Sequence, residues 1–135
     1  MNPKKLFPMV VTEKLAETKQ FYIDKADFEI VYEMPDYLQV RYGDESGPEL
    51  SFFSTTEDGP LGKLPDFKGE GLMISIPTED ADRKALEMEG RGVKLVTRPT
   101  VKPWGWKSFL AQDPNGVLLD FFHVPTENAG QDAAS

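Results

Sequence analysis

The sequence predicts an α+β fold made of two βαβββ modules, and three observations support this. Residues 44–54 are repeated 69 residues later as residues 113–123, with Asp, Gly, Leu, Phe and Phe at equivalent positions. Each copy places a turn pattern before an apolar strand pattern. Each copy also follows the same order of expected elements. Because an internal repeat constrains the whole architecture, the domain is expected to contain two copies of one unit.

The first module is expected to span residues 5–54. Leu15, Phe21 and Tyr22 have a spacing that fits a helix, and Thr12 precedes them as a residue able to cap it. The breaker-rich stretches 35–36 and 44–47 separate β-rich runs. We therefore expect a helix at residues 13–25 and strands at residues 6–12, 28–34, 37–43 and 48–54.

The second module is expected at residues 71–124, after a breaker-rich linker at residues 55–70. Thr78 is the expected cap of a helix whose first turn is acidic, and Gly90 or Gly92 is expected to end it. Strands are expected at residues 71–76, 93–96, 106–112 and 117–123. Residues 125–135 are predicted to form a flexible tail. The two modules, the linker and this tail are expected to make up a single domain at residues 1–135.

Composition restricts the classes of partner. The formal net charge is −8 and no basic stripe accompanies the aromatic residues, so the protein should repel nucleic acid and attract a cationic small molecule. The charge also has a simpler interpretation, which is solubility. Cysteine is absent, no apolar run reaches the length of a membrane span, and no signal peptide is evident. We expect a cytoplasmic protein with no membrane partner.

Alternation along the strands assigns side chains to two faces. One face is apolar and is expected to pack under the helices: Val10, Leu38, Val40, Leu50, Phe52, Leu72, Ile74, Ile76, Phe109, Leu119 and Phe121. The other mixes aromatic and polar side chains: Phe7, Met9, Val11, Tyr37, Gln39, Arg41, Glu49, Ser51, Phe53, Gly71, Met73, Ser75, Trp106, Ser108, Leu110, Asp120 and Phe122. Such a mixture suits a cavity that holds a ligand better than a dry core.

The paired modules, the Phe21-Tyr22 pair at the end of the first helix and the Asp113-Pro-Asn-Gly116 turn together resemble the vicinal oxygen chelate superfamily. This superfamily includes glyoxalase I, extradiol dioxygenases, fosfomycin-resistance enzymes and bleomycin-resistance proteins. The resemblance covers residues 6–124. It implies a glyoxalase/bleomycin-resistance-like half-barrel of mixed sheet around a cavity, and it implies a homodimer.

In the metal-dependent members, four strand positions hold a divalent cation through His, Glu or Gln. The resemblance places these positions at Phe7, Ser51, Gly71 and Asp120, of which Asp120 alone is a good ligand. We therefore expect no metal cofactor. The sole histidine, His123, is out of phase with Asp120, so we interpret it as a packing or capping residue.

Several side chains are candidates for contact with a ligand. Trp104 and Trp106 lie in a turn that could stack on a flat or cationic molecule. Alternatively, one indole could cap the core and the other could close the dimer. Asp120 is the candidate polar anchor or general base, with an ion pair to Arg41 as the alternative. The remaining candidates on this face are Phe7, Tyr37, Gln39, Arg41, Ser51, Phe53, Met73, Ser108 and Phe122.

These observations predict a metal-free protein of the bleomycin-resistance type that sequesters an aromatic or cationic compound. The alternative is a glyoxalase- or dioxygenase-like enzyme, a lyase, isomerase or oxygenase. It would use an atypical metal site that includes Glu49, or Asp120 as general base. A third possibility is a partner or structural module whose hollow is filled by side chains.

Overall fold

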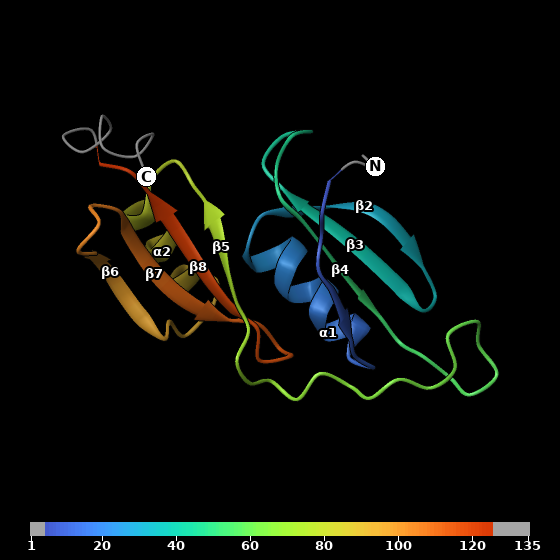
Figure 1. The fold of residues 1–135 in the computed structure, drawn as a ribbon. Helices are drawn as coiled ribbons and strands as arrows, with labels where there is room; N and C mark the ends of the chain where they lie inside the picture. Colours follow the sequence, from blue (N-terminus) through green and yellow to red (C-terminus); the bar gives the residue numbers. More distant parts are fainter. Residues whose placement is uncertain (1–4, 126–135) are drawn as a thin grey trace. The chain divides into compact units, whose positions relative to one another are not determined.

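The computed structural model describes residues 5–125, which form two sheets of four strands each (Figure 1). The first set of elements is β1 (Met9–Val11), α1 (Leu15–Lys19), the π-helix η1 (Gln20–Lys25), β2 (Phe28–Met34), β3 (Tyr37–Tyr42) and β4 (Glu49–Phe53). The second is β5 (Met73–Pro77), α2 (Ala81–Gly90), β6 (Thr97–Val101), β7 (Lys107–Gln112) and β8 (Leu118–His123). No helix among these described elements is long and apolar enough to cross a membrane.

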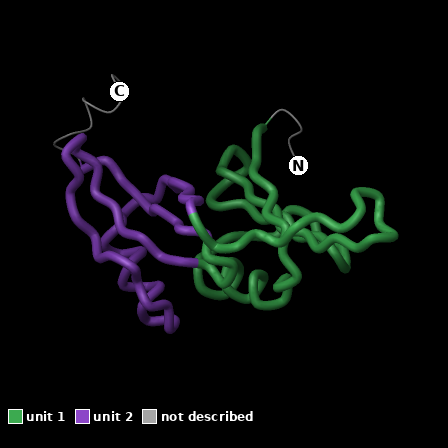
Figure 2. The backbone as a smooth tube through the Cα atoms, turned by 60° about the horizontal axis from the view of Figure 1, so that its bottom comes forward, with its two compact units in different colours: residues 1–70, 113–116 green, residues 71–112, 117–135 purple. Residues whose placement is uncertain are grey.

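The chain divides into two compact units, coloured separately in Figure 2. Unit 1 contains the residues up to Glu70 together with Asp113–Gly116, and unit 2 contains Gly71–Gln112 and the residues from Val117 onward. The turn of the second repeat therefore belongs to unit 1. Of the expected tail at residues 125–135, all but Pro125 lies outside the described residues.

The two sheets have the same topology, which confirms the predicted duplication. The strand order is β1-β4-β3-β2 in unit 1 and β5-β8-β7-β6 in unit 2, with the first pair parallel and the others antiparallel. The repeated turns also match. Asp44 Oδ1 accepts a hydrogen bond from Ser46 N at 2.9 Å, and Asp113 Oδ1 accepts one from Asn115 N at 2.8 Å. Both are Asx turns that lead into the last strand of a module.

Each unit has an aromatic core on the face that alternation predicted. In unit 1 the buried Tyr22 ring lies 4.9 Å from Phe28 and 5.1 Å from Phe52 between ring centroids. In unit 2 Phe109 of β7 stacks on Phe121 of β8 at 5.4 Å between ring centroids. Figure 1 shows α2 packed across these two strands. The predicted core residues Leu72 and Ile74 are half-buried, while the other nine are buried.

Three local predictions were wrong. The first helix is not regular, because α1 continues as the π-helix η1. Asp80, not Thr78, caps α2: its Oδ1 accepts a hydrogen bond from Arg83 N at 3.1 Å, which lowers the pKa of its carboxyl. The strand expected at residues 93–96 begins later in the chain, at β6. β6 is an edge strand, where a proline such as Pro99 is tolerated.

In the sequence, Met9-Val-Val was aligned with Met73-Ile-Ser to match the two modules, and this alignment is displaced by two residues. Met9 pairs with Ser51 in sheet 1, and Ser75 pairs with Asp120 in sheet 2. Since Ser51 and Asp120 are equivalent in the repeat, Met9 corresponds to Ser75 and not to Met73. The side chains are still assigned to the correct faces of the strands, because a shift of two residues leaves their alternation unchanged.

Candidate functional site

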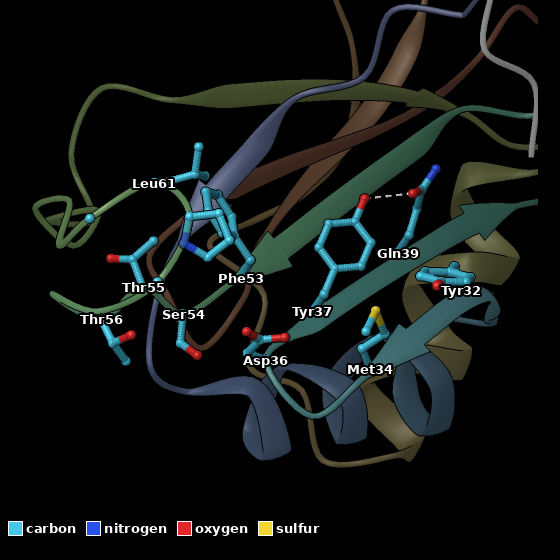
Figure 3. A pocket seen from close by; sticks show the side chains of 13 residues that line it. Tyr32, Met34, Asp36, Tyr37, Gln39, Phe53, Ser54, Thr55, Thr56 and Leu61 are labelled. Carbon is cyan, nitrogen blue, oxygen red and sulfur yellow. Dashed lines mark hydrogen bonds between the residues drawn. The ribbon is translucent and has the colours of Figure 1, made fainter.

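Unit 1 contains a cavity with a volume of about 390 Å³ (Figure 3). The hairpin of β2 and β3 forms one side, and the segment that follows β4 forms the other. The lining residues are Tyr32, Met34, Asp36, Tyr37, Gln39, Phe53, Ser54, Thr55, Thr56, Gly59, Pro60, Leu61 and Gly62. Their side chains are mainly apolar and aromatic, with a few polar groups, which is the usual character of a small-molecule site.

A β-bulge in β2 directs two of these side chains into the cavity. Ile30 pairs with Val40, whereas Tyr32 pairs with Gln39, so β2 has one more residue than β3 across this step. Residues that pair directly across a sheet point to the same face. The extra residue therefore moves Tyr32 and, beyond it, Met34 onto the face of Gln39 and Tyr37. Without the bulge both would point to the opposite face.

Tyr32 and Tyr37 form an aromatic corner of the cavity. Their ring centroids are 6.0 Å apart and the ring planes meet at 63°, an edge arrangement that leaves one face of each ring for other contacts. Phe53 pairs with Tyr37 across β3 and β4 and extends the same surface.

The opposite side of the cavity is folded by two consecutive turns. Gly59 N donates to Thr56 O, and Gly62 N donates to Gly59 O, each at 3.1 Å. Gly62 has a φ of +67°, a conformation that favours glycine. Thr55 Oγ1 accepts from Leu64 N at 2.9 Å and holds the end of this segment. These contacts keep Pro60 and Leu61 at the cavity.

A hydrogen-bonded chain lies beneath the aromatic corner. Tyr37 Oη and Gln39 Oε1 are 2.6 Å apart, and Gln39 Nε2 donates to Glu49 Oε1 at 2.6 Å. Glu49 Oε2 is 3.3 Å from Lys5 Nζ. Gln39 is fully buried and Glu49 is 3% exposed. A buried carboxylate requires such partners, and this chain supplies them.

Six of the candidates belong to unit 2. Trp106 stacks on Phe122 with ring centroids 4.3 Å apart and planes at 10°, whereas Trp104 is 60% exposed. Asp120 Oδ2 accepts a hydrogen bond from Ser75 Oγ at 2.9 Å. Ser108 is buried and pairs with Phe122 across β7 and β8, and Met73 is about half-exposed.

Arg41 and Asp120, weighed as an ion pair, belong to different units, and each has a partner within its own unit. Arg41 Nη2 lies 2.6 Å from Glu29 Oε1, and this hydrogen bond raises the pKa of the guanidinium. Asp120 has Ser75 as its partner. His123 is a capping residue, as predicted, because its Nδ1 accepts a hydrogen bond from Ala81 N at 2.8 Å at the start of α2.

The positions carried over for a metal site need one correction. The strand register places Met9 beside Ser51 and Ser75 beside Asp120, where the carried-over positions were Phe7 and Gly71. Thioether and hydroxyl groups are poor ligands for the cations that carboxylate and imidazole groups hold. Within residues 5–125, no three His, Cys, Asp or Glu side chains are grouped so that they could hold a metal ion. Of the four side chains in the register positions, Asp120 alone is a usual ligand of a divalent cation.

The cavity includes only part of the predicted site. Of the predicted ligand-binding residues, Tyr37, Gln39 and Phe53 line it, whereas Phe7, Arg41 and Ser51 belong to unit 1 without lining it. The sequence analysis assigned no face to the strand 28–34 and missed Tyr32 and Met34, which simple alternation from Ile30 would have put on the opposite face. It also missed Ser54, at the end of an expected strand, and residues 55–62, which lie in the stretch that breakers marked as a linker. The apolar Pro60-Leu61 pair within that linker was the available signal.

Comparison with known proteins identifies the family. Residues 7–121 match the model of the Glyoxalase/Bleomycin resistance protein/Dioxygenase superfamily. The chain therefore belongs to this superfamily. A search of curated proteins finds no match.

Several solved structures share the fold. A glyoxalase/bleomycin resistance protein/dioxygenase from Nocardioides has a TM-score of 0.71 at 16% identity, with 93% of this chain and 87% of that chain covered. The bleomycin resistance determinant encoded on transposon Tn5 has a TM-score of 0.66 at 19% identity, covering 90% and 98%. TnmS3, an antibiotic-binding protein from Streptomyces sp. CB03234, has a TM-score of 0.68 at 22% identity, covering 92% and 98%.

Proposed function

We propose that the protein binds a small aromatic compound in the cavity of unit 1 and sequesters it without a metal ion. The observation that carries this proposal is the lining of the cavity, where the rings of Tyr32, Tyr37 and Phe53 and the side chains of Met34 and Leu61 surround about 390 Å³. Apolar burial of a flat ligand against such a surface supplies the main favourable free energy of binding.

Charge favours a neutral or cationic ligand. Among the described lining residues, Asp36 is the sole charged side chain, and the whole chain carries a formal charge of −8. Two proteins of the same fold are a bleomycin resistance determinant and an antibiotic-binding protein, which supports binding of a small molecule as the function. The poor metal ligands beside Ser51 and Asp120 support the metal-free part of the proposal. Chemistry at the ligand is not needed for sequestration.

The proposal is tested with indene, an apolar bicyclic aromatic hydrocarbon. A ligand that binds only the native state raises the free energy of unfolding by about 2.7 kcal/mol when its concentration is a hundred times its Kd. We expect indene to raise the melting temperature and to shift the backbone NMR signals of residues 54–62. We also expect a homodimer, which sedimentation of the 15.2 kDa chain would measure.

Two leucines provide a matched pair of variants. Leu61 lines the cavity and is 60% exposed, while Leu86 on α2 does not line it and is 63% exposed. Leu61→Asp should weaken indene binding at least tenfold, because it introduces a charge that the apolar ligand desolvates. Leu86→Asp should leave binding unchanged. Absence of binding to the native protein, or equal losses in the two variants, would refute the proposed site.

A further inference from the structure

We infer that the cavity selects aromatic ligands that carry a hydrogen-bond donor, because the hydroxyl of Tyr37 is fixed as an acceptor toward the ligand. This inference rests on the proposed function and adds a chemical class to it. The residues that fix the polarity are Gln39, Glu49 and Lys5, none of which needs to contact the ligand.

Glu49 sets the direction in which the hydrogen bonds of this chain run from donor to acceptor. Its carboxylate has acceptor oxygens only, and Lys5 Nζ lies 3.3 Å from Oε2. The same ammonium donates to Glu45 O at 3.1 Å and to Gly47 O, so it is held at this position by the turn before β4. The second carboxylate oxygen, Oε1, faces Gln39 at 2.6 Å.

The orientation of the buried Gln39 amide follows from the acceptor at Glu49. An acceptor at Glu49 requires the Nε2 group of Gln39 to face it, and the Oε1 atom then faces Tyr37. Because Gln39 is fully buried, turning the amide over would set its carbonyl oxygen against the carboxylate and leave its NH₂ against a hydroxyl. The hydrogen bonds from Glu49 through Gln39 to Tyr37 therefore have one arrangement in which every donor faces an acceptor.

Tyr37 is the end of this chain at the cavity. Its hydroxyl hydrogen is used in the 2.6 Å bond to Gln39 Oε1, so the lone pairs of Oη remain for the ligand (Figure 3). Asp36, at the hairpin beside it, also offers acceptor oxygens alone as a carboxylate. An aromatic compound with an N–H group or a protonated amine satisfies these acceptors, whereas a compound with acceptors only leaves them unpaired on desolvation.

Three bicyclic probes of the same shape test the inference: indole has an N–H donor, benzofuran has an acceptor oxygen, and indene has neither. One neutral hydrogen bond contributes about 1 kcal/mol, so indole should bind the native protein about fivefold more tightly than benzofuran or indene. NMR titration gives the three Kd values under identical conditions. Equal affinities, or tighter binding of benzofuran, would overturn the inference while leaving the proposed function intact. Failure of all three to bind would overturn both.

Two variants locate the cause. Tyr37→Phe removes the acceptor and keeps the ring, so the affinities for indole and benzofuran should become about equal. Glu49→Gln replaces an acceptor-only group by one that also donates, so the chain loses its fixed polarity and the ratio of the two affinities should fall toward one. This ratio is insensitive to a general loss of stability. A ratio that is unchanged in either variant would contradict the role assigned to that residue.

Discussion

Tyr22 Oη donates a hydrogen bond of 2.7 Å to Asp113 Oδ2, although the two residues are 91 positions apart. The contact joins the end of the first helical segment to the turn of the second repeat. Both are among the features on which the family resemblance rests. The same turn is held by Asn115, whose Nδ2 donates to Thr18 Oγ1 and whose Oδ1 accepts from Thr12 Oγ1. The contacts explain why Asp113–Gly116 belongs to unit 1.

Tyr22→Phe is expected to lower the free energy of unfolding by about 1.5–3 kcal/mol, the usual contribution of a hydrogen bond to a charged group. Tyr22 is fully buried, so no water replaces the lost hydroxyl. Urea denaturation measures the change. Tyr32→Phe is the control, because Tyr32 is 46% exposed, and its effect should stay within about 0.5 kcal/mol. Equal effects of the two substitutions would contradict the importance of the Tyr22–Asp113 contact.

The same tyrosine predicts how stability responds to alkaline pH. Burial, followed by the charge and hydrogen bond of Asp113, raises the pKa of Tyr22 well above its ordinary value. In the unfolded chain a tyrosine ionises near pH 10, as in model peptides. The favourable contribution is therefore complete below pH 10 and is lost as pH rises from 10 toward the pKa of the folded state.

Above pH 10 the native protein should lose about 1.4 kcal/mol per pH unit through this residue, and Tyr22→Phe should not. The difference in unfolding free energy between the two proteins should consequently narrow between pH 9 and pH 11. Paired urea titrations at these pH values measure it. A constant difference would show that Tyr22 titrates normally in the folded state.

Gly116→Ala should destabilise the protein strongly. A Cβ at this position would lie 2.5 Å from Gly69 Cα and 3.0 Å from Gly69 O, and the backbone φ is +93°. Steric conflict with backbone and the left-handed conformation together predict a loss of about 2 kcal/mol or more. Gly90→Ala is the control, since no atom lies within 4 Å of its added Cβ and it ends α2. That substitution should leave stability unchanged or raise it by up to about 1 kcal/mol.

Metal analysis tests the metal-free part of the proposal. Protein purified without a chelator should contain well under one equivalent of zinc, nickel, manganese or iron, and EDTA should leave its melting temperature unchanged. The reason is the donor set, in which Met9 lies beside Ser51 and Ser75 beside Asp120. A stoichiometric metal would instead favour the alternative of a glyoxalase- or dioxygenase-like enzyme.

Much of the fold could be predicted from the sequence, because its signals are local and repeated. The strand at Phe28–Met34 was predicted to the residue, and the faces of β3, β4 and β8 followed from simple alternation. The register between strands was not predicted, because an even displacement leaves every side chain on its correct face. Apolar pattern alone therefore does not distinguish Met9 beside Ser51 from Phe7 beside Ser51.

The cavity was predicted less well than the fold. The alternation of side chains along the strands identified Tyr37, Gln39 and Phe53 as residues of the cavity face. A β-bulge has no characteristic amino-acid composition, so Tyr32 and Met34 were missed. The role of residues 54–62 depends on hydrogen bonds such as Leu64 N to Thr55 Oγ1, which pattern analysis does not reveal. The predicted ligand contacts in unit 2, with Trp104 and Asp120 among them, stay predictions.

The extra residue in β2 has a consequence for how relatives of this protein could diverge. β6 also has one more residue than its partner strand, between the Thr97–Leu110 and Thr100–Ser108 pairs, so both halves of the duplication carry this irregularity. If β2 paired with β3 without this extra residue, Tyr32 and Met34 would turn away from Tyr37, while Phe28 and Ile30 would stay opposite Tyr42 and Val40. Strand register, more than the identity of any one side chain, would then decide whether a relative keeps a binding chamber here.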